Sequence, residues 1–211
     1  MLPYYYSVSE YLKDTYGKKL YKLSLSGNMT CPNRDGKLDT RGCIFCSSHG
    51  SGDFAVSDID KAKEIVSNKY SGTEYIAYFQ SFTNTYADVS YLRDLFMPII
   101  ERDDIRILSI ATRPDCLDDD VLSLLDELNH IKPVWIELGL QTTNNSTAKY
   151  IRRGYNLSAY DNAVNNLLSI RIAPIVHMII GLPGETISDY TATAKYIAQS
   201  GASGIKISLL H

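Results

Sequence analysis

Six short apolar runs, separated by amphipathic stretches, organise the hydrophobic and polar positions of this chain. The apolar runs cover residues 19–26, 74–81, 105–112, 134–140, 173–181 and 204–210. Most of them are nearly continuous in apolar residues, as are strands buried on both faces of a parallel sheet. Helical periodicity covers residues 57–68, 87–101, 117–129, 157–170 and 186–200. The pattern therefore predicts strands and helices in alternation.

This alternation predicts a parallel sheet with right-handed crossovers. Six strands are two fewer than a closed eight-stranded barrel needs. We therefore expect an α/β fold with a six-stranded partial (β/α)6 barrel of the TIM type, and a flat doubly wound sheet is the alternative. Polar and glycine-bearing turns follow four of the runs, at residues 81–85, 112–115, 141–145 and 181–185. In a barrel these turns meet at the carboxyl ends of the strands, where active sites lie.

The length of the chain and the position of the last strand set the expected domain organisation. A chain of 211 residues fits one domain with one sizeable core, and residues 1–18 are expected to form an N-terminal extension. The last strand, 204–210, reaches the end of the chain with no helix after it. We therefore expect that a C-terminal segment after strand six is lacking and that an apolar strand edge is exposed.

Composition and charge argue against two classes of protein. The longest apolar run, residues 172–182, is far shorter than the roughly 20 residues of a membrane span, and the N-terminus lacks the apolar segment of a signal peptide. A soluble, cytoplasmic protein is therefore expected. The net charge of −3 argues against a strongly basic nucleic-acid binder. Residues 1–42, however, carry seven Lys/Arg against four Asp/Glu, which predicts a modest basic rim.

Three cysteines near the start, Cys31, Cys43 and Cys46, carry the most specific chemistry in the sequence. Three thiolates can hold an iron–sulfur cluster and leave one iron open to a substrate or cofactor, whereas clusters with four cysteine ligands usually carry electrons. With His49, the same cysteines could instead form a Cys3His zinc site. The cysteines alone do not decide between these two metals. Cys116 is expected to be a buried free thiol and not a fourth ligand.

The motifs around and after these cysteines resemble those of the radical S-adenosylmethionine (SAM) superfamily. The matching segments are CPNRDG (31–36), CIFC (43–46), GSGDFA (50–55), TRPDCL (112–117), ELGLQT (137–142), RRGY (152–155), HMIIGLPGET (177–186) and GIKISLLH (204–211). The cysteines of this superfamily most often show Cys-x3-Cys-x2-Cys spacing, whereas the first gap here is eleven residues. This longer gap is similar to that of the YhcC/YtqA-like proteins, which are relatives of the Elongator catalytic subunit.

The resemblance implies two cofactors and a reaction. Cys31, Cys43 and Cys46 would bind three irons of a [4Fe–4S] cluster, and SAM would chelate the fourth. An electron from a flavodoxin or ferredoxin type of donor would then cleave SAM to methionine and a 5′-deoxyadenosyl radical, which abstracts hydrogen from the substrate. Kinship with the Elongator group suggests the wobble-uridine side chain of tRNA as that substrate. The alternatives are a small-molecule substrate and a zinc-stabilised binding module without catalysis.

The resemblance also implies which residues contact SAM. They are Phe45 beside the adenine, Ser81, Thr83 and Asn84 near the amino group, Glu137 and Gln141 at the ribose, Arg153 at the carboxylate, and Gly181 and Glu185 in a turn that approaches the adenine. Glu137 and Gln141 are four residues apart, which is two strand periods and places both on one face.

Two of the polar residues have purely structural alternatives. Glu137 could be a buried carboxylate paired with Arg113 or Lys206, because a buried charge needs a partner. His177 lies in the middle of an apolar run, and we expect a core histidine whose hydrogen bonds are satisfied. For Phe45, an ordinary buried aromatic is as good an interpretation as an adenine contact.

Overall fold

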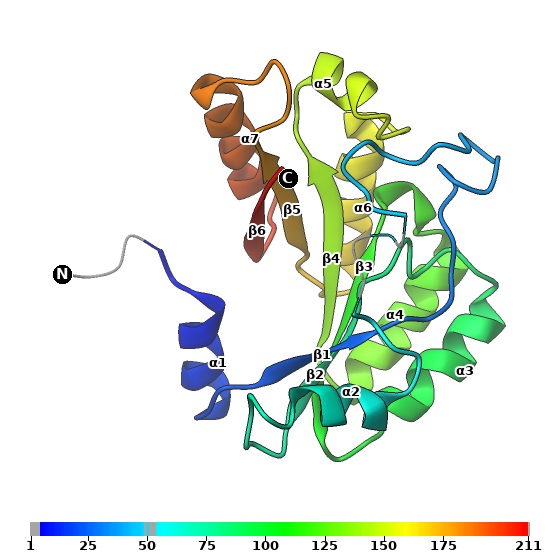
Figure 1. Ribbon diagram of the computed structural model, residues 1–211, viewed down its shortest axis with the longest axis vertical. Coiled ribbons are helices and arrows are strands. Elements are labelled where there is room, and N and C mark those ends of the chain that lie inside the picture. Colours follow the sequence, from blue (N-terminus) through cyan, green and yellow to red (C-terminus); the bar gives the residue numbers. More distant parts are fainter. Residues whose placement is uncertain (1–4, 49, 51–53, 211) are drawn as a thin grey trace.

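A computed structural model of the chain describes residues 5–48, 50 and 54–210. All six predicted strands are present, they are parallel, and they lie in the order of the sequence. Their bounds are β1 Tyr21–Leu25, β2 Tyr75–Phe79, β3 Ile105–Thr112, β4 Val134–Gln141, β5 Ile175–Ile180 and β6 Gly204–Leu209. The sheet curls into a partial barrel whose edge strands are β1 and β6 (Figure 1). The predicted half-barrel is therefore confirmed, since a doubly wound sheet would reverse its strand order.

The five predicted helices lie between the strands, and α3, α4 and α6 cover the outer face of the sheet (Figure 1). The bounds of the five are α2 Ile59–Val66, α3 Val89–Ile100, α4 Asp119–Ile131, α6 Leu157–Ser169 and α7 Ile187–Gln199. The main core forms between this face and the helices. Phe96 of α3, for example, contacts Phe79 of β2 with ring centroids 5.0 Å apart.

The periodicity does not predict the short elements α1 (Val8–Tyr16), α5 (Asn145–Tyr150) and the 3-10 turn η1 (Pro114–Cys116). Helix α1 nevertheless has clear local signals. Ser7 and Glu10 form a capping box, in which each side chain accepts the backbone N–H of the other. Gly17 ends the helix at φ 69°, a left-handed conformation that glycine adopts without strain. The Ser-x-x-Glu spacing was therefore a readable signal for a helix within the predicted extension.

Side chains on the inner face of the sheet form layers, because residues two apart along a strand share a face. The layer nearest the amino ends of the strands is apolar and contains Ile76, Ile107 and Trp135. Helix α1 packs against this layer. Leu12 is buried in one cluster with these side chains, and the ring of Tyr11 lies 5.9 Å from that of Trp135. The next layer towards the carboxyl ends is polar.

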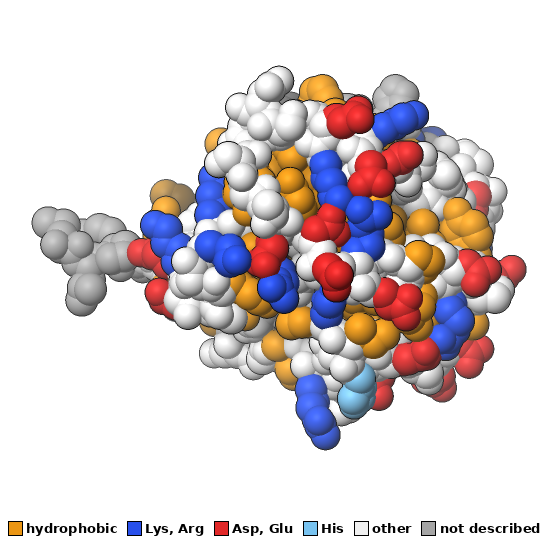
Figure 2. Space-filling model, turned by 90° about the horizontal axis from the view of Figure 1, so that it is seen from below, with side chains coloured by type: hydrophobic (Ala, Val, Ile, Leu, Met, Phe, Trp, Pro, Cys, Tyr) orange, Lys and Arg blue, Asp and Glu red, His pale blue; other side chains and the backbone are white. Residues whose placement is uncertain are grey.

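Figure 2 views the end at which the strands begin, where acidic and basic side chains are intermixed. Glu74 pairs with Lys18 at 3.1 Å and with Arg106 at 2.7 Å, and Asp104 pairs with Arg102 at 3.0 Å. Partly exposed pairs of this kind each contribute about 1 kcal/mol or less. These ion pairs stabilise the amino end of the barrel modestly, and active sites of such barrels lie at the opposite end, where the strands finish.

Replacing Leu12 by alanine should lower the free energy of unfolding by about 2–4 kcal/mol, because the change leaves a cavity beneath the apolar layer. Val8 lies on the same helix and is 54% exposed, so Val8→Ala should change stability by about 0.5 kcal/mol or less. Urea denaturation of both variants measures the difference. Equally small effects would show that α1 does not pack under the barrel in solution.

Candidate functional site

A cavity of about 420 Å³ opens at the carboxyl ends of the strands and extends along their inner face. Its volume is within the usual range for small-molecule and cofactor sites. The predicted site residues that line it are Cys31, Cys43, Phe45, Cys46, Thr83, Glu137, Gln141 and Arg153. Ser81, Asn84, Gly181 and Glu185 are described by the structure but do not belong to the lining. The structure thus brings together segments that are more than 100 residues apart in the sequence.

The cysteine loop between β1 and α2 is anchored by two side chains. Asn33 is buried, and its Nδ2 donates to the carbonyls of Arg152 and Arg153 at 2.7 and 3.1 Å and lies 3.2 Å from Cys43 Sγ. Gly154 permits this approach, because a Cβ there would lie 2.6 Å from Asn33 Oδ1. Arg34 donates to the carbonyl of Ser47 at 2.6 Å. Cys43 is therefore tied to the segment after α5.

The four cysteines are free thiols, and three of them share the cavity. Burial, with smaller contributions from the two neighbouring cysteines, raises the pKa of Cys43 to about 11. Within the described ranges, no three His, Cys, Asp or Glu side chains are close enough to hold a single metal ion. A mononuclear zinc site needs thiolates about 3.8 Å apart, whereas a cubane cluster binds each ligand through a different iron and spreads them further. Cys31, Cys43 and Cys46 line one cavity, an arrangement that fits a cluster with three thiolate ligands.

His49, the fourth ligand of the zinc alternative, lies outside the described residues. Cys116 belongs to η1 and not to the cavity lining, and burial raises the pKa of its thiol to about 12. Cys116 is therefore a half-buried thiol outside the cavity lining, less buried than the sequence predicts.

The loop after β2 places Thr83 in the lining and Asn84 behind it. Asn84 is completely buried, and its Nδ2 donates to the carbonyl of Ala111 at 2.9 Å. Its Oδ1 is the one buried side-chain oxygen or nitrogen in the described part of the chain that lacks a hydrogen-bond partner. Buried acceptors are rarely left unpaired, so this oxygen fits a site whose donor comes from a ligand.

The end of β4 departs from regular strand geometry. Gln141 has φ 64°, and the register with β5 shifts between Gly139 and Gln141. A bulge of this kind redirects side chains and is common beside active sites. Gln141 and Glu137 both line the cavity. The hydroxyl of Tyr155 donates its one proton to the carbonyl of Gly139 at 2.5 Å and lies 3.3 Å from Gln141 Oε1.

Arg153 is only 1% exposed, and its Nη1 donates to the carbonyls of Leu140 and Thr142 at 3.0 and 2.6 Å. Arg153 and Arg113 lie over the ring of Tyr155, at 4.7 and 5.0 Å from its centroid. Arg113 pairs with Asp115, whereas no acid among the described residues forms an ion pair with Arg153. Arg153 therefore brings a positive charge to the cavity wall that the described acids do not balance.

The turn after β5 forms the side of the mouth. Gly181 has φ 94° and donates its N–H to the hydroxyl of Tyr190, while Glu185 accepts a hydrogen bond from the hydroxyl of Thr142. Glu185 therefore ties this turn to the end of β4. Phe45 packs against an apolar cluster at the same place, formed by Ile151, Ile179 and Leu182. Its position suits either interpretation of Phe45.

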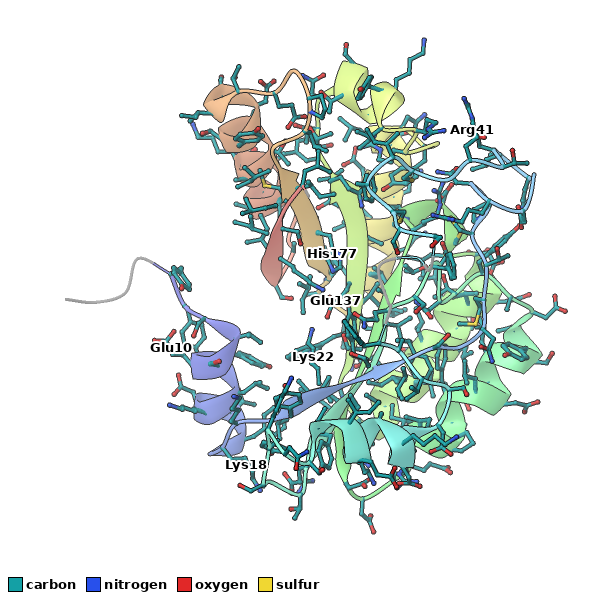
Figure 3. The ribbon with its side chains drawn as sticks, in the orientation of Figure 1. Glu10, Lys18, Lys22, Arg41, Glu137 and His177 are labelled. Carbon is teal, nitrogen blue, oxygen red and sulfur yellow. The ribbon has the colours of Figure 1, made fainter. Side chains whose placement is uncertain are left out.

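On the inner face of the sheet, a polar layer is built around the carboxylate of Glu137 (Figure 3), and four of its residues line the cavity: Tyr78, Glu137, His177 and Lys206. Each strand contributes one side chain: Lys22 from β1, Tyr78 from β2, Ser109 from β3, Glu137 from β4, His177 from β5 and Lys206 from β6. Glu137 accepts hydrogen bonds from Ser109 at 3.0 Å, His177 at 2.7 Å, Lys206 at 3.2 Å and Lys22. The carboxylate is 0% exposed. We call these six residues the Glu137 layer.

The charges of this layer determine how Glu137 titrates. Burial alone would raise the pKa of its carboxyl, but the hydrogen bond from His177 and the charges of Lys22 and Lys206 outweigh burial and hold the pKa well below its usual value. Burial lowers the pKa of His177, since it disfavours the charged imidazole. Glu137 is therefore a buried carboxylate that pairs with Lys206, one of the two partners considered, and not with Arg113. His177 is a histidine whose hydrogen bond is made within the layer, to Glu137, as predicted.

Sequence reasoning missed several residues of the site. Lys22, Tyr78 and Ser109 complete the Glu137 layer beside Lys206, which was named as a possible partner of Glu137, and Tyr155 lies next to Gln141. A weak signal existed, because Lys22 and Lys206 stand between apolar residues in strands and must point to the opposite face from them. Nothing in the sequence shows that both reach the same carboxylate.

A cysteine-lined cavity at the mouth of a parallel half-barrel defines a class of protein, and sequence comparison identifies it. The profile of the radical SAM superfamily matches residues 40–197. The chain therefore belongs to the radical SAM superfamily.

Relatives and solved structures agree with this assignment. The chain is 43% identical to the uncharacterized protein YtqA of Bacillus subtilis over 98% of this chain and 66% of that protein. It is 36% identical to YhcC of Escherichia coli over 93% and 65%, respectively. It therefore spans about two thirds of the length of these relatives. The structure of Elp3 from the archaeon Methanocaldococcus infernus shares the fold, with a TM-score of 0.63, 15% identity, and coverage of 90% of this chain and 45% of that one.

A more distant relative has a named substrate class. The tRNA-2-methylthio-N(6)-dimethylallyladenosine synthase of Buchnera aphidicola is 29% identical over 56% of this chain and 28% of that protein.

Within the described residues, no helix has both the length and the apolar character needed to cross a membrane.

Glu137→Gln should lower the free energy of unfolding at pH 7 by about 2–3 kcal/mol, because it leaves two ammonium groups without a buried counter-charge and their partial exposure limits the cost. The folded-state pKa of Glu137 is depressed below its usual 4.5. Its contribution is therefore complete above that pH and declines by about 1.4 kcal/mol per pH unit below it.

Urea denaturation at pH 7 and between pH 5 and 3.5 measures both effects. The exposed pair of Glu127 with Arg93 supplies the control, since Glu127→Gln should cost about 0.5 kcal/mol or less. A stability difference between wild type and Glu137→Gln that does not narrow on acidification would contradict the assignment.

Proposed function

We propose that this protein is a radical SAM enzyme. One observation carries the proposal: three cysteines, a buried arginine without an acidic partner among the described residues, and a glutamine on a strand bulge converge on one cavity. Family membership implies a [4Fe–4S] cluster and SAM, and the residues present fit both. Together these cofactors supply reductive cleavage of SAM to a 5′-deoxyadenosyl radical that abstracts hydrogen from a substrate. A small reductant protein of the flavodoxin or ferredoxin type would provide the electron.

The cluster end of the cavity is formed by Cys31, Cys43 and Cys46. Their three thiolates would hold the cluster and leave one position of it open to SAM. Asn33 holds Cys43 in place by its hydrogen bonds to the segment after α5. The cysteine loop therefore needs no further ligand from Cys116.

The SAM end is formed by the turns after the strands. Arg153 is fixed by two backbone carbonyls and holds the SAM carboxylate through a charge-assisted contact, for which a planar guanidinium is suited. Gln141, which lies next to Tyr155, hydrogen-bonds the ribose. The hydroxyl of Thr83 and the backbone near Ser81 accept from the amino group, and Asn84 supports this loop from behind by donating to the carbonyl of Ala111.

The remaining predicted contacts bound the adenine. Phe45 packs beside the ring from the cysteine loop, and Gly181 lets backbone approach it from the turn after β5. Glu185 acts through Thr142, because its carboxylate accepts the hydrogen bond of that hydroxyl. These groups position the cofactor and exclude water from it.

For the substrate, we propose a tRNA wobble-uridine side chain, and a small molecule is the alternative. Lys149 and Arg152 line a second hollow of about 550 Å³ beside the cysteine loop, where phosphates of an RNA backbone could bind. The Buchnera relative is named for an activity on tRNA. Mass spectrometry of tRNA nucleosides from cells with and without the gene decides the question. Loss of a wobble-uridine modification supports tRNA, and unchanged nucleosides exclude it.

Anaerobically reconstituted protein should be brown and contain about four irons per chain, as a [4Fe–4S] centre requires. Replacing Cys31, Cys43 or Cys46 by alanine should reduce the iron content to near zero, since each ligand is one of only three. Cys116→Ala is the matched control and should keep the iron. Iron and sulfide analysis of the four variants tests the ligand set, and loss of iron from Cys116→Ala would overturn it.

With reductant, the reconstituted protein should form 5′-deoxyadenosine from SAM. Gln141→Ala should weaken SAM binding up to about tenfold, because it removes one neutral hydrogen bond, and should leave the iron content unchanged. Gln199 is exposed at the end of α7, so Gln199→Ala should match wild type in both respects. Equilibrium binding of SAM to the three proteins makes the comparison, and unaltered affinity in Gln141→Ala would remove Gln141 from the ribose site.

A further inference from the structure

The Glu137 layer contains more positive than negative charge. Two lysine ammonium groups and one imidazole face a single carboxylate. One lysine would be enough to neutralise Glu137, so the second is in excess of what a buried ion pair needs. Glu137 is 0% exposed, whereas the side chains of Lys22 and Lys206 are 34% and 40% exposed. The negative charge is thus covered, whereas both lysine side chains are partly exposed: Lys206 belongs to the cavity lining, and Lys22 reaches Glu137 from β1 without belonging to it.

The two lysines come from opposite edges of the sheet. Lys22 lies on β1 and Lys206 on β6, and they meet at Glu137 in the middle of the sheet. Both contact the aromatic ring of Tyr78, whose centroid lies 4.3 Å from the Nζ of Lys22 and 4.9 Å from that of Lys206. The ammonium groups are therefore held on a shared aromatic platform on either side of one carboxylate.

Each ammonium group retains hydrogen-bonding capacity. An ammonium group has three N–H donors. Among the described residues, the Nζ of Lys22 donates to Glu137, and that of Lys206 donates to Glu137 and to the hydroxyl of Tyr78. At least one donor of each lysine is therefore available to a ligand.

The cavity above the layer is positively charged as well. Among the described residues that line the cavity, Glu137 is the only acid, against four Lys/Arg: Arg34, Arg113, Arg153 and Lys206. A concave site lined by one sign of charge attracts ligands of the opposite sign. Arg153 and the cysteines account for the cofactor at the mouth, but the positive charge in the Glu137 layer has no such assignment.

We propose that Lys22 and Lys206 bind an oxyanion of the substrate, a carboxylate or a phosphate, at the inner end of the cavity. This proposal rests on the proposed function, since it takes the cysteine-lined cavity to be the active site. The two ammonium groups would hold the anion, and Glu137 and Tyr78 would keep them in place. The anion would then lie at the deep end and the remainder of the substrate would extend towards the cysteine loop, where the reaction takes place.

Equilibrium dialysis with two separate probes, radiolabelled inorganic phosphate and radiolabelled succinate, tests the site in the cluster-reconstituted protein. Lys22→Met and Lys206→Met should each weaken binding of the preferred probe about tenfold or more, because each removes a charge-assisted contact. Both side chains are partly exposed, so these variants should fold. Lys195→Met, an exposed lysine of α7, is the matched control and should bind as wild type does. The probe that binds more tightly identifies the oxyanion as phosphate or carboxylate.

Glu137→Gln gives a result of opposite sign. It removes the competing carboxylate and should bind the anion more tightly than wild type, despite its lower stability. A purely structural role for the two lysines predicts no such gain. Circular dichroism of each variant confirms that binding is compared between folded proteins, and the two lysine variants carry the test if Glu137→Gln does not fold.

Failure of this proposal differs from failure of the proposed function. Protein that cleaves SAM but binds neither probe, or binds them independently of Lys22 and Lys206, would overturn the oxyanion site alone. Lysine-dependent binding in protein that neither holds iron nor cleaves SAM would uphold the oxyanion site and overturn the proposed function.

Discussion

The buried carboxylate of Glu137 connects the parts of this half-barrel that strand pairing leaves apart. Strands β1 and β6 are the two edges of the sheet and do not pair, yet Lys22 from one and Lys206 from the other both bind Glu137 on β4. Ser109 and His177 add contacts from the strands on either side of β4. The curvature of the sheet brings these side chains together, and their ion pairs in turn hold the two edges towards the centre.

Such a carboxylate is costly to bury, and its neighbours determine whether the arrangement is stable. Transfer of an ion from water into the protein interior costs several kcal/mol even after relaxation. Here that cost is offset by four hydrogen bonds to the carboxylate, two of which come from lysine ammonium groups. Towards the amino ends of the strands, the apolar layer and Leu12 of α1 form a hydrophobic cluster beneath this polar layer. Above it, the turns carry the cysteines and Arg153. Along the strands, the inner face thus changes from apolar side chains that stabilise the fold to polar side chains and cysteines that form the candidate site.

The elements of the fold were largely predictable, because strands and helices depend on local periodicity. All six strands and five of the helices lie where the apolar pattern places them. Helix α1 was missed because it has only nine residues and precedes the first strand, although the capping box marks its start. The bulge at Gln141 could not be predicted, since it depends on the register between β4 and β5.

The site was predictable where its residues form local motifs and not where it depends on distant pairing. The cysteines and Arg153 belong to recognisable motifs, and the structure places them around one cavity. Among the partners of Glu137, His177 is 40 residues away along the chain and Lys22 is 115 residues away. No local pattern in the sequence indicates that Lys206, and not Arg113, pairs with Glu137. In the structure, Arg113 forms its ion pair with Asp115, two residues further along the chain, and Lys206 is the residue that pairs with Glu137.

The central claim is that three cysteines hold a cluster with one iron open to SAM at this cavity. Electron paramagnetic resonance of the reduced, reconstituted protein tests it most directly, because direct coordination alters the spectrum of the cluster. The account predicts that SAM shifts the g values of the reduced [4Fe–4S] signal. A cluster signal that is identical with and without saturating SAM would contradict the account.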